Sequence, residues 1–517
     1  MKQFFGREDA LKLQLLCASA GINCPTLAEE IEIEGIAMDS RRVVPGGMFI
    51  CIRGIHADGH AYISRAIAMG AVCILTDCKV ETNVPDTVVH LTADNTRCAA
   101  AYLFDAWNGF PSKRLRIIGV TGTNGKTSVT HMLKAIFESA LCRCGVIGTV
   151  GCESVGRPLV KRAKNELFNM TTPDPPELYR VLAEMAEDGV EYVFMEVTSH
   201  ALALDKVAPL SFEAAIFTNL TPEHLDFHGS MEAYADAKAT LFTKSKLSII
   251  NRDSTYAPQM TERAAGKILT CSVSCYADYT AENCVCNENG IAYDLCSGSS
   301  RIRITCPITG RFTVANSMQA AICGLQMGVS VKNVKNALAS LSGVKGRMER
   351  VRLGMGADFS VFIDYAHTPD ALEKLLCTAK DLKRDGGRIV LLFGCGGDRD
   401  KSKRSVMGRL ASHYADYTVV TSDNSRSEEP EAIIKDILRG IDKKHPHTVI
   451  VDRKQAIEYV VQTAKSRDVI LLAGKGHEEY EITRTERLPF CEKEIVRKAF
   501  EVRRRTEQNT DAMENDK

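Results

Sequence analysis

The sequence predicts an α/β protein with three domains: a small N-terminal α/β domain, a central domain on a mostly parallel sheet, and a C-terminal doubly wound domain. Three observations support this prediction. The chain has 517 residues, enough for about three domains of ordinary size. Short apolar runs typical of buried strands alternate with segments of helical periodicity. Two breaks rich in Gly, Pro or Ser, at residues 107–112 and 342–347, separate the three stretches.

These breaks give expected domain boundaries at residues 1–112, 113–343 and 344–502. Residues 503–517 are charged and lack apolar anchors, which predicts a disordered tail.

Composition indicates a cytoplasmic protein that binds neither nucleic acid nor membrane. Lys plus Arg equals Asp plus Glu at 65 each, so no global charge favours a polyanion or a lipid surface. The 19 cysteines are odd in number and lack a Cys-x-x-Cys pair, which indicates reduced thiols. Glu8 and Asp9 interrupt the region where a signal peptide needs an apolar core.

The N-terminal stretch has strand-like runs at residues 48–52 and 71–75, with a helix expected between them at residues 61–69. Before them lies the polar turn Asp39-Ser40-Arg41. This turn could bind a ligand or cap a loop, and the residues alone favour the cap.

The central stretch contains a glycine-rich loop at residues 119–128, between an apolar strand at 115–118 and a helix at 129–137. Such a loop aims backbone N–H groups and a helix N-terminus at one point, which suits phosphate. Lys126 would reach the outer phosphates and the Thr127 hydroxyl would bind Mg²⁺, as in a P-loop domain. Because Val120 stands where the usual pattern has Gly, a simple connecting turn is the alternative.

Three polar side chains further along are candidate metal ligands. Glu196 ends the buried strand at residues 192–195, where P-loop proteins deliver an acid to Mg²⁺. His224 lies in a polar loop, and Lys238 lies on the apolar stripe of a helix that includes Leu241 and Phe242. Taken without their neighbours, His224 would by default be a loop histidine with its hydrogen bonds satisfied, and Lys238 a surface lysine with a buried stem.

The third stretch predicts a Rossmann-like domain, whose ligands belong at the carboxyl ends of its strands. Strands are expected near residues 361–363, 389–393, 417–420, 449–451 and 469–472. Polar clusters follow four of them, at residues 364–367, 394–400, 422–426 and 474–478. An antiparallel insertion is expected earlier, at residues 276–310.

Together these motifs resemble the Mur ligase family, the ATP-dependent amide-forming enzymes of peptidoglycan synthesis. The resemblance covers nearly the whole chain, through Asp39-Ser40-Arg41, residues 122–127, Thr171-Thr172-Pro173, residues 196–202, 219–228 and 474–478. It is greatest to members that add the third residue to UDP-N-acetylmuramoyl-L-alanyl-D-glutamate. It implies roles in cell-wall biogenesis, cell shape and cell division.

The resemblance implies a role for each matching residue. ATP would be bound by Gly122, Thr123, Asn124, Gly125, Lys126, Thr127, Ser128, Asn316, Arg347 and Asp364. The UDP-linked substrate would be bound by Ser40, Thr171, Thr172, Thr198 and Lys206. Catalysis would depend on Lys126, Glu196, His224 and Lys238, with Lys238 as a carbamate (N6-carboxylysine). Mg²⁺ would be held by Thr127, Glu196, His224 and Lys238.

The amino acid implied is meso-2,6-diaminopimelate, because residues 423–426 resemble the Asp-Asn-Pro-Arg motif of enzymes that use it. A guanidinium can grip its distal carboxylate, which L-lysine lacks. The contacts would be Arg399, Asp423, Asn424, Ser425, Arg426, Gly474 and Glu478. Three residues depart from the family pattern: Ser425 replaces Pro, Lys206 replaces Arg and Thr198 replaces Ser.

The implied reaction activates the D-glutamyl carboxylate as an acyl phosphate, which the incoming amine then displaces. A monomer is favoured. Three alternatives stay open: the same ligase using L-lysine or another amino acid, a ligase joining glutamate to folate, and a non-catalytic nucleotide-binding regulator or specialised copy.

Overall fold

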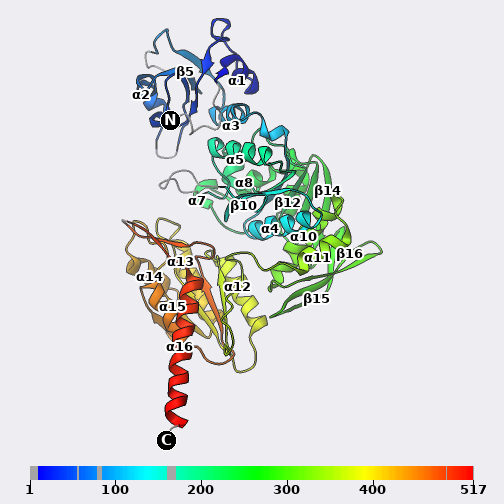
Figure 1. The fold of residues 1–517 in the computed structure, drawn as a ribbon, viewed down its shortest axis with the longest axis vertical. Coiled ribbons are helices and arrows are strands. Elements are labelled where there is room, and N and C mark those ends of the chain that lie inside the picture. Colours follow the sequence, from blue (N-terminus) through cyan, green and yellow to red (C-terminus); the bar gives the residue numbers. More distant parts are fainter. Residues whose placement is uncertain (1–9, 55–56, 79–83, 160–169, 485, 516–517) are drawn as a thin grey trace. The chain divides into compact units, whose positions relative to one another are not determined.

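The computed structural model describes residues 10–54, 57–78, 84–159, 170–484 and 486–515 (Figure 1). The chain divides into two compact units. The first consists of Met1–Gly122, Ile136–Leu220 and Ser230–Thr270, and the second of Thr123–Ala135, Thr221–Gly229 and Cys271–Lys517. Each unit combines parallel sheets with covering helices, which confirms the predicted α/β class.

The N-terminal part of the first unit is a four-stranded parallel sheet. Its strands, in the order β3-β4-β5-β6, are β3 (Ile36–Ala37), β4 (Gly47–Ile50), β5 (Ala71–Thr76) and β6 (Val89–Thr92). Met48 and Ile50 point into the core shared with α1 (Leu13–Ser19) and α3 (Thr96–Trp107), whereas Phe49 faces α2 (Ile63–Ala68). This alternation buries both faces of the sheet. A short pair, β1 (Leu11–Lys12) and β2 (Glu32–Ile33), precedes it.

The rest of the first unit is built on five parallel strands in the order β8-β11-β7-β12-β13. They are β7 (Arg116–Thr121), β8 (Cys144–Gly148), β11 (Tyr192–Glu196), β12 (Ala214–Phe217) and β13 (Leu247–Asn251). Two antiparallel strands, β9 (Gly151–Ser154) and β10 (Arg157–Pro158), extend the β8 edge. Helices of this part of the sequence are α4 (Lys126–Ser139), α5 (Pro175–Glu187), α6 (Ser199–Ala203), α8 (Met231–Ala239) and α9 (Ala257–Arg263).

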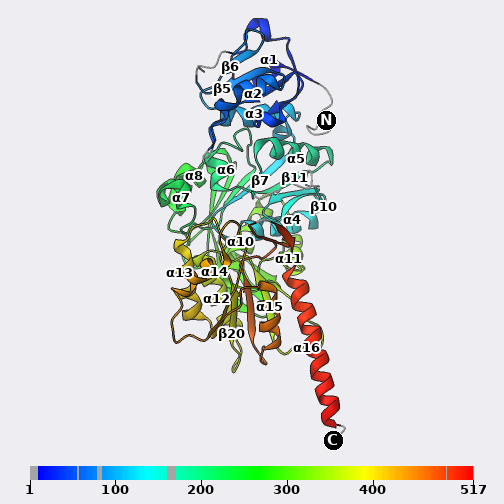
Figure 2. The same cartoon turned by 90° about the vertical axis from the view of Figure 1, so that its left-hand side faces the viewer.

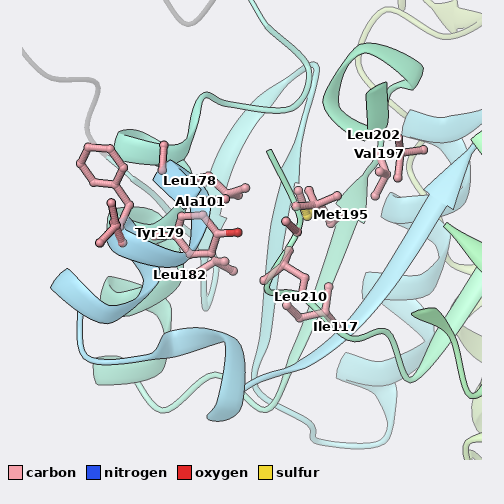
Figure 3. Close-up of a cluster of buried hydrophobic side chains, with 14 of the residues drawn as sticks. Ala101, Ile117, Leu178, Tyr179, Leu182, Met195, Val197, Leu202 and Leu210 are labelled. Atoms are coloured by element: carbon pink, nitrogen blue, oxygen red, sulfur yellow. The ribbon is translucent and has the colours of Figure 1, made fainter. Parts of the chain in front are cut away.

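One apolar core joins α3 and α5 to this sheet (Figure 3). Tyr179 of α5 is fully buried there, and its hydroxyl donates to the Lys206 carbonyl at 3.1 Å. Burial raises the pKa of this phenol well above its usual value, so Tyr179 stays a neutral donor. Helix α8 ends at Ala239, so Leu241 and Phe242 lie beyond the helix expected to include them, although both are fully buried.

The second unit contains the predicted antiparallel insertion. Strands β15 (Tyr279–Asn287), β16 (Gly290–Ser297) and β17 (Ser300–Cys306) pair as consecutive hairpins, and β14 (Lys267–Ser272) pairs with β15 through Cys271 and Ser272. Helices α7 (Leu225–His228), α10 (Arg311–Gln326) and α11 (Val331–Ala339) complete this part.

The remainder of the second unit is the predicted doubly wound sheet, in the order β18-β19-β23-β20-β21-β22. Strands β19 (Ser360–Asp364), β20 (Ile389–Phe393), β21 (Tyr417–Val420), β22 (His447–Val449) and β23 (Val469–Ala473) are parallel, and β18 (Glu349–Arg350) is antiparallel. One face packs on α12 (Pro369–Leu382), α13 (Ser402–Tyr414) and α14 (Pro430–Leu438). The other face packs on α15 (Arg453–Gln462) and α16 (Glu492–Asn515) (Figure 2).

Helix α16 differs from the prediction for the chain's end. It runs through Glu492–Asn515, whereas the sequence predicts disorder from residue 503. Arg503 anchors its middle, because its Nη1 donates to the carbonyls of Val461 and Ala464. Beyond it the chain mixes good helix formers, namely Arg504, Arg505, Glu507, Gln508 and Ala512, with Thr, Asn and Asp residues that favour helix less. A hairpin of β24 (Tyr480–Ile482) and β25 (Arg487–Pro489) precedes α16.

All 19 cysteines are free thiols, as predicted. Among the described residues, no helix combines the length and apolar composition needed to cross a bilayer.

Candidate active site

In the first unit, Glu196 ends β11 beside β7 and is almost completely buried. Its Oε1 accepts from Thr149 N at 2.8 Å and its Oε2 from the Thr149 hydroxyl at 3.0 Å. A Cβ on Gly148 would come within 2.2 Å of Oε1, so only glycine leaves room for this carboxylate. Both carboxylate oxygens therefore accept hydrogen bonds from Thr149.

Lys238 is also buried, on α8 of the same unit. Its Nζ donates to the carbonyl of Gly122 at 3.0 Å and lies 4.7 Å from the centre of the Tyr234 ring. Because Gly122 follows β7 and Glu196 pairs with Val120 of β7, the structure brings Lys238 and Glu196 to the same end of that strand. This contradicts the alternative of a solvent-exposed Lys238.

The predicted substrate-binding threonines adjoin Glu196. The Thr172 hydroxyl donates to the Glu196 carbonyl at 2.8 Å and lies 3.2 Å from the Thr198 hydroxyl. Thr171 Oγ1 lies 3.1 Å from Thr149 Oγ1. Two hydroxyl pairs therefore adjoin Glu196: Thr149 and Thr171 at its carboxylate, and Thr172 and Thr198 at its backbone carbonyl.

Lys206 and Ser40 are held by local contacts in the first unit. Lys206 is 6% exposed, and its Nζ lies 2.7 Å from Asp174 Oδ1 and 3.3 Å from Met170 Sδ. Ser40 is buried in a turn that Asp39 caps by accepting from Arg41 N at 2.9 Å.

In the second unit, the glycine-rich loop leads into α4 as predicted, and Gly125 has φ +89°. Lys126 Nζ donates to the Thr123 carbonyl at 2.9 Å, so the side chain curls over its own loop. A Cβ on Gly125 would lie 2.6 Å from Asn316 Oδ1, which places Asn316 against the loop. The Asn124 amide donates to Asp370 at 2.7 Å.

Glu223, beside the predicted ligand His224, lies among cationic groups of this unit. Its Oε1 is 3.7 Å from His367 Nε2, and its Oε2 is 3.8 Å from His224 Nε2. Burial opposes its ionisation, but the nearby His367, His224 and Lys126 hold the pKa of Glu223 well below its usual value. His224 has φ +57°, a left-handed conformation that is uncommon for a side chain of this size.

Arg347 and Asp364 lie at the predicted linker of the second unit. Arg347 Nη2 donates to the Thr127 hydroxyl at 3.1 Å, and its guanidinium lies 4.7 Å from the centre of the Tyr365 ring. Asp364 accepts from Met348 N at 2.7 Å and Ala366 N at 2.8 Å. Its complete burial raises its pKa, against the lowering effect of Arg347.

The linker also packs against a loop at the C-terminal rim. Gly346 has φ +66°, and a Cβ there would come within 2.1 Å of His477 N. Tyr365 N donates to the Gly346 carbonyl at 3.0 Å.

Two of the four predicted polar clusters meet through Asn424. Its Nδ2 donates to Glu478 Oε2 at 2.7 Å, while its Oδ1 accepts from Lys475 Nζ at 3.0 Å and Ile482 N at 2.9 Å. Asp423 is buried 3.6 Å from Lys475 Nζ. Burial opposes its ionisation, but Lys475 and Arg453 lower the pKa of Asp423. Burial, followed by the Asp423 charge, raises the pKa of Glu478.

A third cluster joins them through Arg426, which has φ +53° and donates from Nη1 to Gly397 O at 2.7 Å. Gly474 has φ +116°, and a Cβ there would lie 2.6 Å from Asp423 Oδ2. Ser425 is buried. Arg399 is exposed, with Nη1 3.4 Å from the carbonyl of its neighbour Asp398.

Sequence reasoning missed several residues of these clusters. Glu223 and Lys475 are adjacent to predicted residues and carry charge, so both could have been found. Thr149 follows β8 at the same sheet edge as Glu196, a signal that strand order would have supplied. Asp370 and His367 come from a distant segment, and only the fold reveals their partners.

Comparisons with known proteins fit this arrangement. Three family models match in chain order: "Mur ligase family, catalytic domain" at residues 32–106, "Mur ligase middle domain" at 120–324 and "Mur ligase, glutamate ligase domain" at 346–476. A protein of Syntrophomonas wolfei, named UDP-N-acetylmuramoyl-L-alanyl-D-glutamate--2,6-diaminopimelate ligase, is 41% identical over 472 residues, covering 90% of this chain and 94% of the relative. The chain belongs to the Mur ligase family.

Two further comparisons agree. A Clostridium acetobutylicum protein named UDP-N-acetylmuramoyl-L-alanyl-D-glutamate--2,6-diaminopimelate ligase 1 is 40% identical over 486 residues, covering 94% of this chain and 96% of its own. A solved structure titled as the same 2,6-diaminopimelate ligase is 30% identical with a TM-score of 0.67, covering 96% of this chain and 99% of that chain. The chain thus has the three-domain architecture of Mur ligases.

Some of the predicted ligands suit the Mg²⁺ that the family implies. Glu196 and Thr127 offer the hard oxygen atoms that Mg²⁺ prefers, and the Glu196 carboxylate is buried. Lys238 fits only as an anion, because an ammonium group cannot bind a cation. The five residues are divided between the two units: Glu196 and Lys238 belong to the first, and Lys126, Thr127 and His224 to the second. Their convergence on one metal-bound nucleotide therefore stays a prediction.

Proposed function

We propose that this chain is an ATP-dependent ligase that joins meso-2,6-diaminopimelate to the D-glutamate of UDP-N-acetylmuramoyl-L-alanyl-D-glutamate in peptidoglycan synthesis. The observation that carries the proposal is the 41% identity to a relative with that name over 90% of the chain. Its three domains have the boundaries 1–112, 113–343 and 344–502, which agree with the order of the three family models.

The reaction must first activate a carboxylate, since oxide is too poor a leaving group for an amine to displace. The D-glutamyl side-chain carboxylate attacks the γ-phosphorus of ATP and releases ADP. The amine then attacks the acyl phosphate carbon through a tetrahedral intermediate, inorganic phosphate leaves, and the amine gives up a proton to solvent. Lys126, at the start of α4, offsets charge on the transferring phosphoryl group.

The nucleotide is bound in this proposal by the loop from Gly122 to Ser128 and by Asn316, Arg347 and Asp364. Support comes from the contacts of Arg347 with Thr127 and of Asn316 with Gly125. Mg²⁺, held by Thr127, Glu196, His224 and Lys238, supplies charge neutralisation at the phosphates when bound.

Lys238 is proposed to react with CO₂ and form a carbamate. Burial disfavours the ammonium form. The neutral amine attacks the carbon of CO₂ to form an N–C bond and releases a proton to solvent, which gives an anionic carbamate suited to a metal. The UDP-linked substrate is bound by Ser40, Thr171, Thr172, Thr198 and Lys206, of which the three threonines adjoin Glu196.

Arg426 and Glu478 are proposed to select the diamino acid. Arg426 uses Nη1 on the Gly397 carbonyl, so its remaining N–H groups can grip the distal carboxylate of diaminopimelate. Glu478 can pair with the distal ammonium. These two groups are supported by the neighbouring residues Asp423, Asn424 and Gly474. The proposed amino-acid site also includes Ser425 and Arg399.

An amide-synthesis assay tests the proposal with purified chain, ATP, Mg²⁺, the UDP-linked dipeptide and a panel of amino acids. We expect phosphate release and a tripeptide product with diaminopimelate. Product with L-lysine supports the alternative specificity, and no phosphate release with any amino acid supports a regulator. Arg426→Lys should raise KM for diaminopimelate and leave KM for ATP unchanged. Arg409→Lys is a matched control, because Arg409 is an exposed arginine on α13 outside the proposed contacts.

A separate assay addresses Lys238. Protein equilibrated with ¹³C-labelled CO₂ should show one carbamate signal by NMR, and Lys238→Arg should abolish it. A signal that persists in the variant contradicts the carbamate. A cytoplasmic monomer is the proposed state, and size-exclusion chromatography with light scattering tests the monomer.

A further inference from the structure

A cluster of metal-binding side chain types lies in the N-terminal sheet, outside the residues assigned to nucleotide, substrate or amino acid. Arg53 follows β4, and Asp77 and Cys78 follow β5, so adjacent parallel strands deliver them to one sheet edge. His60 adds its imidazole from the helical turn Gly59–Tyr62. Single donor atoms of His60, Asp77 and Cys78 all lie within 4.8 Å of one another.

The His60 imidazole is already oriented for a metal. Its Nδ1 lies 2.6 Å from Asp58 Oδ1, and the same oxygen accepts from His60 N at 3.0 Å. A carboxylate on Nδ1 keeps the proton on that nitrogen and leaves a lone pair on Nε2. Within the described chain, His60 Nε2 is buried and makes no hydrogen bond of acceptable geometry, although a carboxylate oxygen of Asp77 lies nearby.

The donor spacing matches tetrahedral zinc. His60 Nε2 lies 3.2 Å from Asp77 Oδ1. Two ligands about 2.0–2.1 Å from zinc at the tetrahedral angle lie about 3.3 Å apart. Thiolate, imidazole and carboxylate are the usual zinc donors, whereas Mg²⁺ prefers oxygen alone.

A cation already occupies part of this cluster. Arg53 Nη2 lies 3.2 Å from Asp77 Oδ1 and 3.3 Å from Cys78 Sγ, so the guanidinium neutralises the groups that a metal would bind. The Arg53 side chain is 57% exposed and can move into solvent. Thr76, whose hydroxyl donates to the Cys78 carbonyl at 2.8 Å, fixes the backbone of the cysteine.

We propose that His60, Asp77 and Cys78 bind one Zn²⁺ ion, with Asp58 orienting His60 and Arg53 competing for the ligands. Binding displaces the Arg53 guanidinium. The Cys78 thiol releases its proton to solvent as the sulfur–metal bond forms, and no electron is transferred. Water occupies the fourth position.

Zinc content of the full-length chain tests the proposal. Protein exposed to Zn²⁺ and then dialysed against metal-free buffer should hold one more zinc per chain than Cys78→Ser or His60→Gln. Cys377→Ser is the matched control, because Cys377 is an exposed thiol on α12. Co²⁺ should give a thiolate charge-transfer band in the wild type and in the control, and the band should be absent in Cys78→Ser.

Two further variants distinguish a zinc site from a set of side chains that only hydrogen-bond to one another. Asp58→Asn should weaken zinc binding about 10–100-fold, as loss of an orienting carboxylate does. Arg53→Met should tighten it about fivefold, the value of one exposed ion pair, and misfolding cannot produce such a gain. Equal zinc content in wild type and Cys78→Ser, or weaker binding in Arg53→Met, overturns the proposal.

Discussion

The ion pair of Arg453 and Glu492 gives the sharpest stability prediction. Both side chains are buried, and Arg453 Nε and Nη2 lie 2.9 and 2.8 Å from Glu492 Oε1. Arg453 also donates to the carbonyls of Ser422 at 3.1 Å and Ala473 at 2.8 Å. One guanidinium therefore connects the start of α16 to the segment after β21 and to the last residue of β23.

Arg453→Met should be strongly destabilising, because it leaves the Glu492 charge buried without its partner. Removing one member of such a pair costs about 3–5 kcal/mol. At about 2–4 °C per kcal/mol, the unfolding midpoint of the C-terminal domain should fall by about 6–20 °C. Differential scanning calorimetry measures this fall.

The double variant Arg453→Met with Glu492→Met should recover at least half of the loss, since neither charge remains. Recovery is incomplete because the Ser422 and Ala473 carbonyls still lose their donor. Lys454→Met changes the exposed neighbouring residue and should leave the midpoint within 1–2 °C, about the effect of an ordinary surface substitution. A single variant costing under about 1 kcal/mol, or a double variant no more stable than the single, would refute the reasoning.

Three other changes have defined outcomes. Lys126→Met should lower kcat for phosphate release about 10²–10³-fold with an unchanged circular dichroism spectrum, and an active variant would contradict the role of Lys126. Ser425→Pro should raise the kcat/KM ratio of diaminopimelate over L-lysine, because proline stiffens the backbone before Arg426; an unchanged ratio argues against this. Hydrogen bonds from Arg404 lower the pKa of Glu428 from 4.5 to about 2, so this pair stabilises the fold above pH 4.5 and the stabilisation is lost as pH falls towards 2. Urea unfolding of Glu428→Gln should show a weaker pH dependence over that range than the wild type.

The sequence predicted much of the framework because strands and phosphate loops have local signatures. The apolar run at residues 48–52 predicted a strand, and β4 lies there with Met48 and Ile50 buried on one face and Phe49 on the other. The polar clusters were placed correctly on one rim because the carboxyl ends of parallel strands share an edge.

The sequence did not predict which side chains, far apart along the chain, contact each other. Asn124 contacts Asp370, 246 residues away, and no local pattern encodes such a pair. Helix α16 shows a second limit, since disorder was inferred from missing apolar anchors, yet the helix continues to Asn515. The end of α8 at Ala239 shows a third limit of prediction from sequence. Leu241 and Phe242 are buried as the apolar pattern suggests, but they lie beyond the helix that the pattern predicts.

The close approach of Gly346 to His477 has a mechanical consequence. With 2.1 Å between an added Cβ and the His477 nitrogen, the two backbone segments touch without any intervening side chain. Such segments cannot slide past each other, so a torsional movement at Gly346 must drag the loop that carries Glu478 along with it. A compound bound beneath this loop would consequently restrict the torsional movement at Gly346. It would not need to resemble ATP or an amino acid.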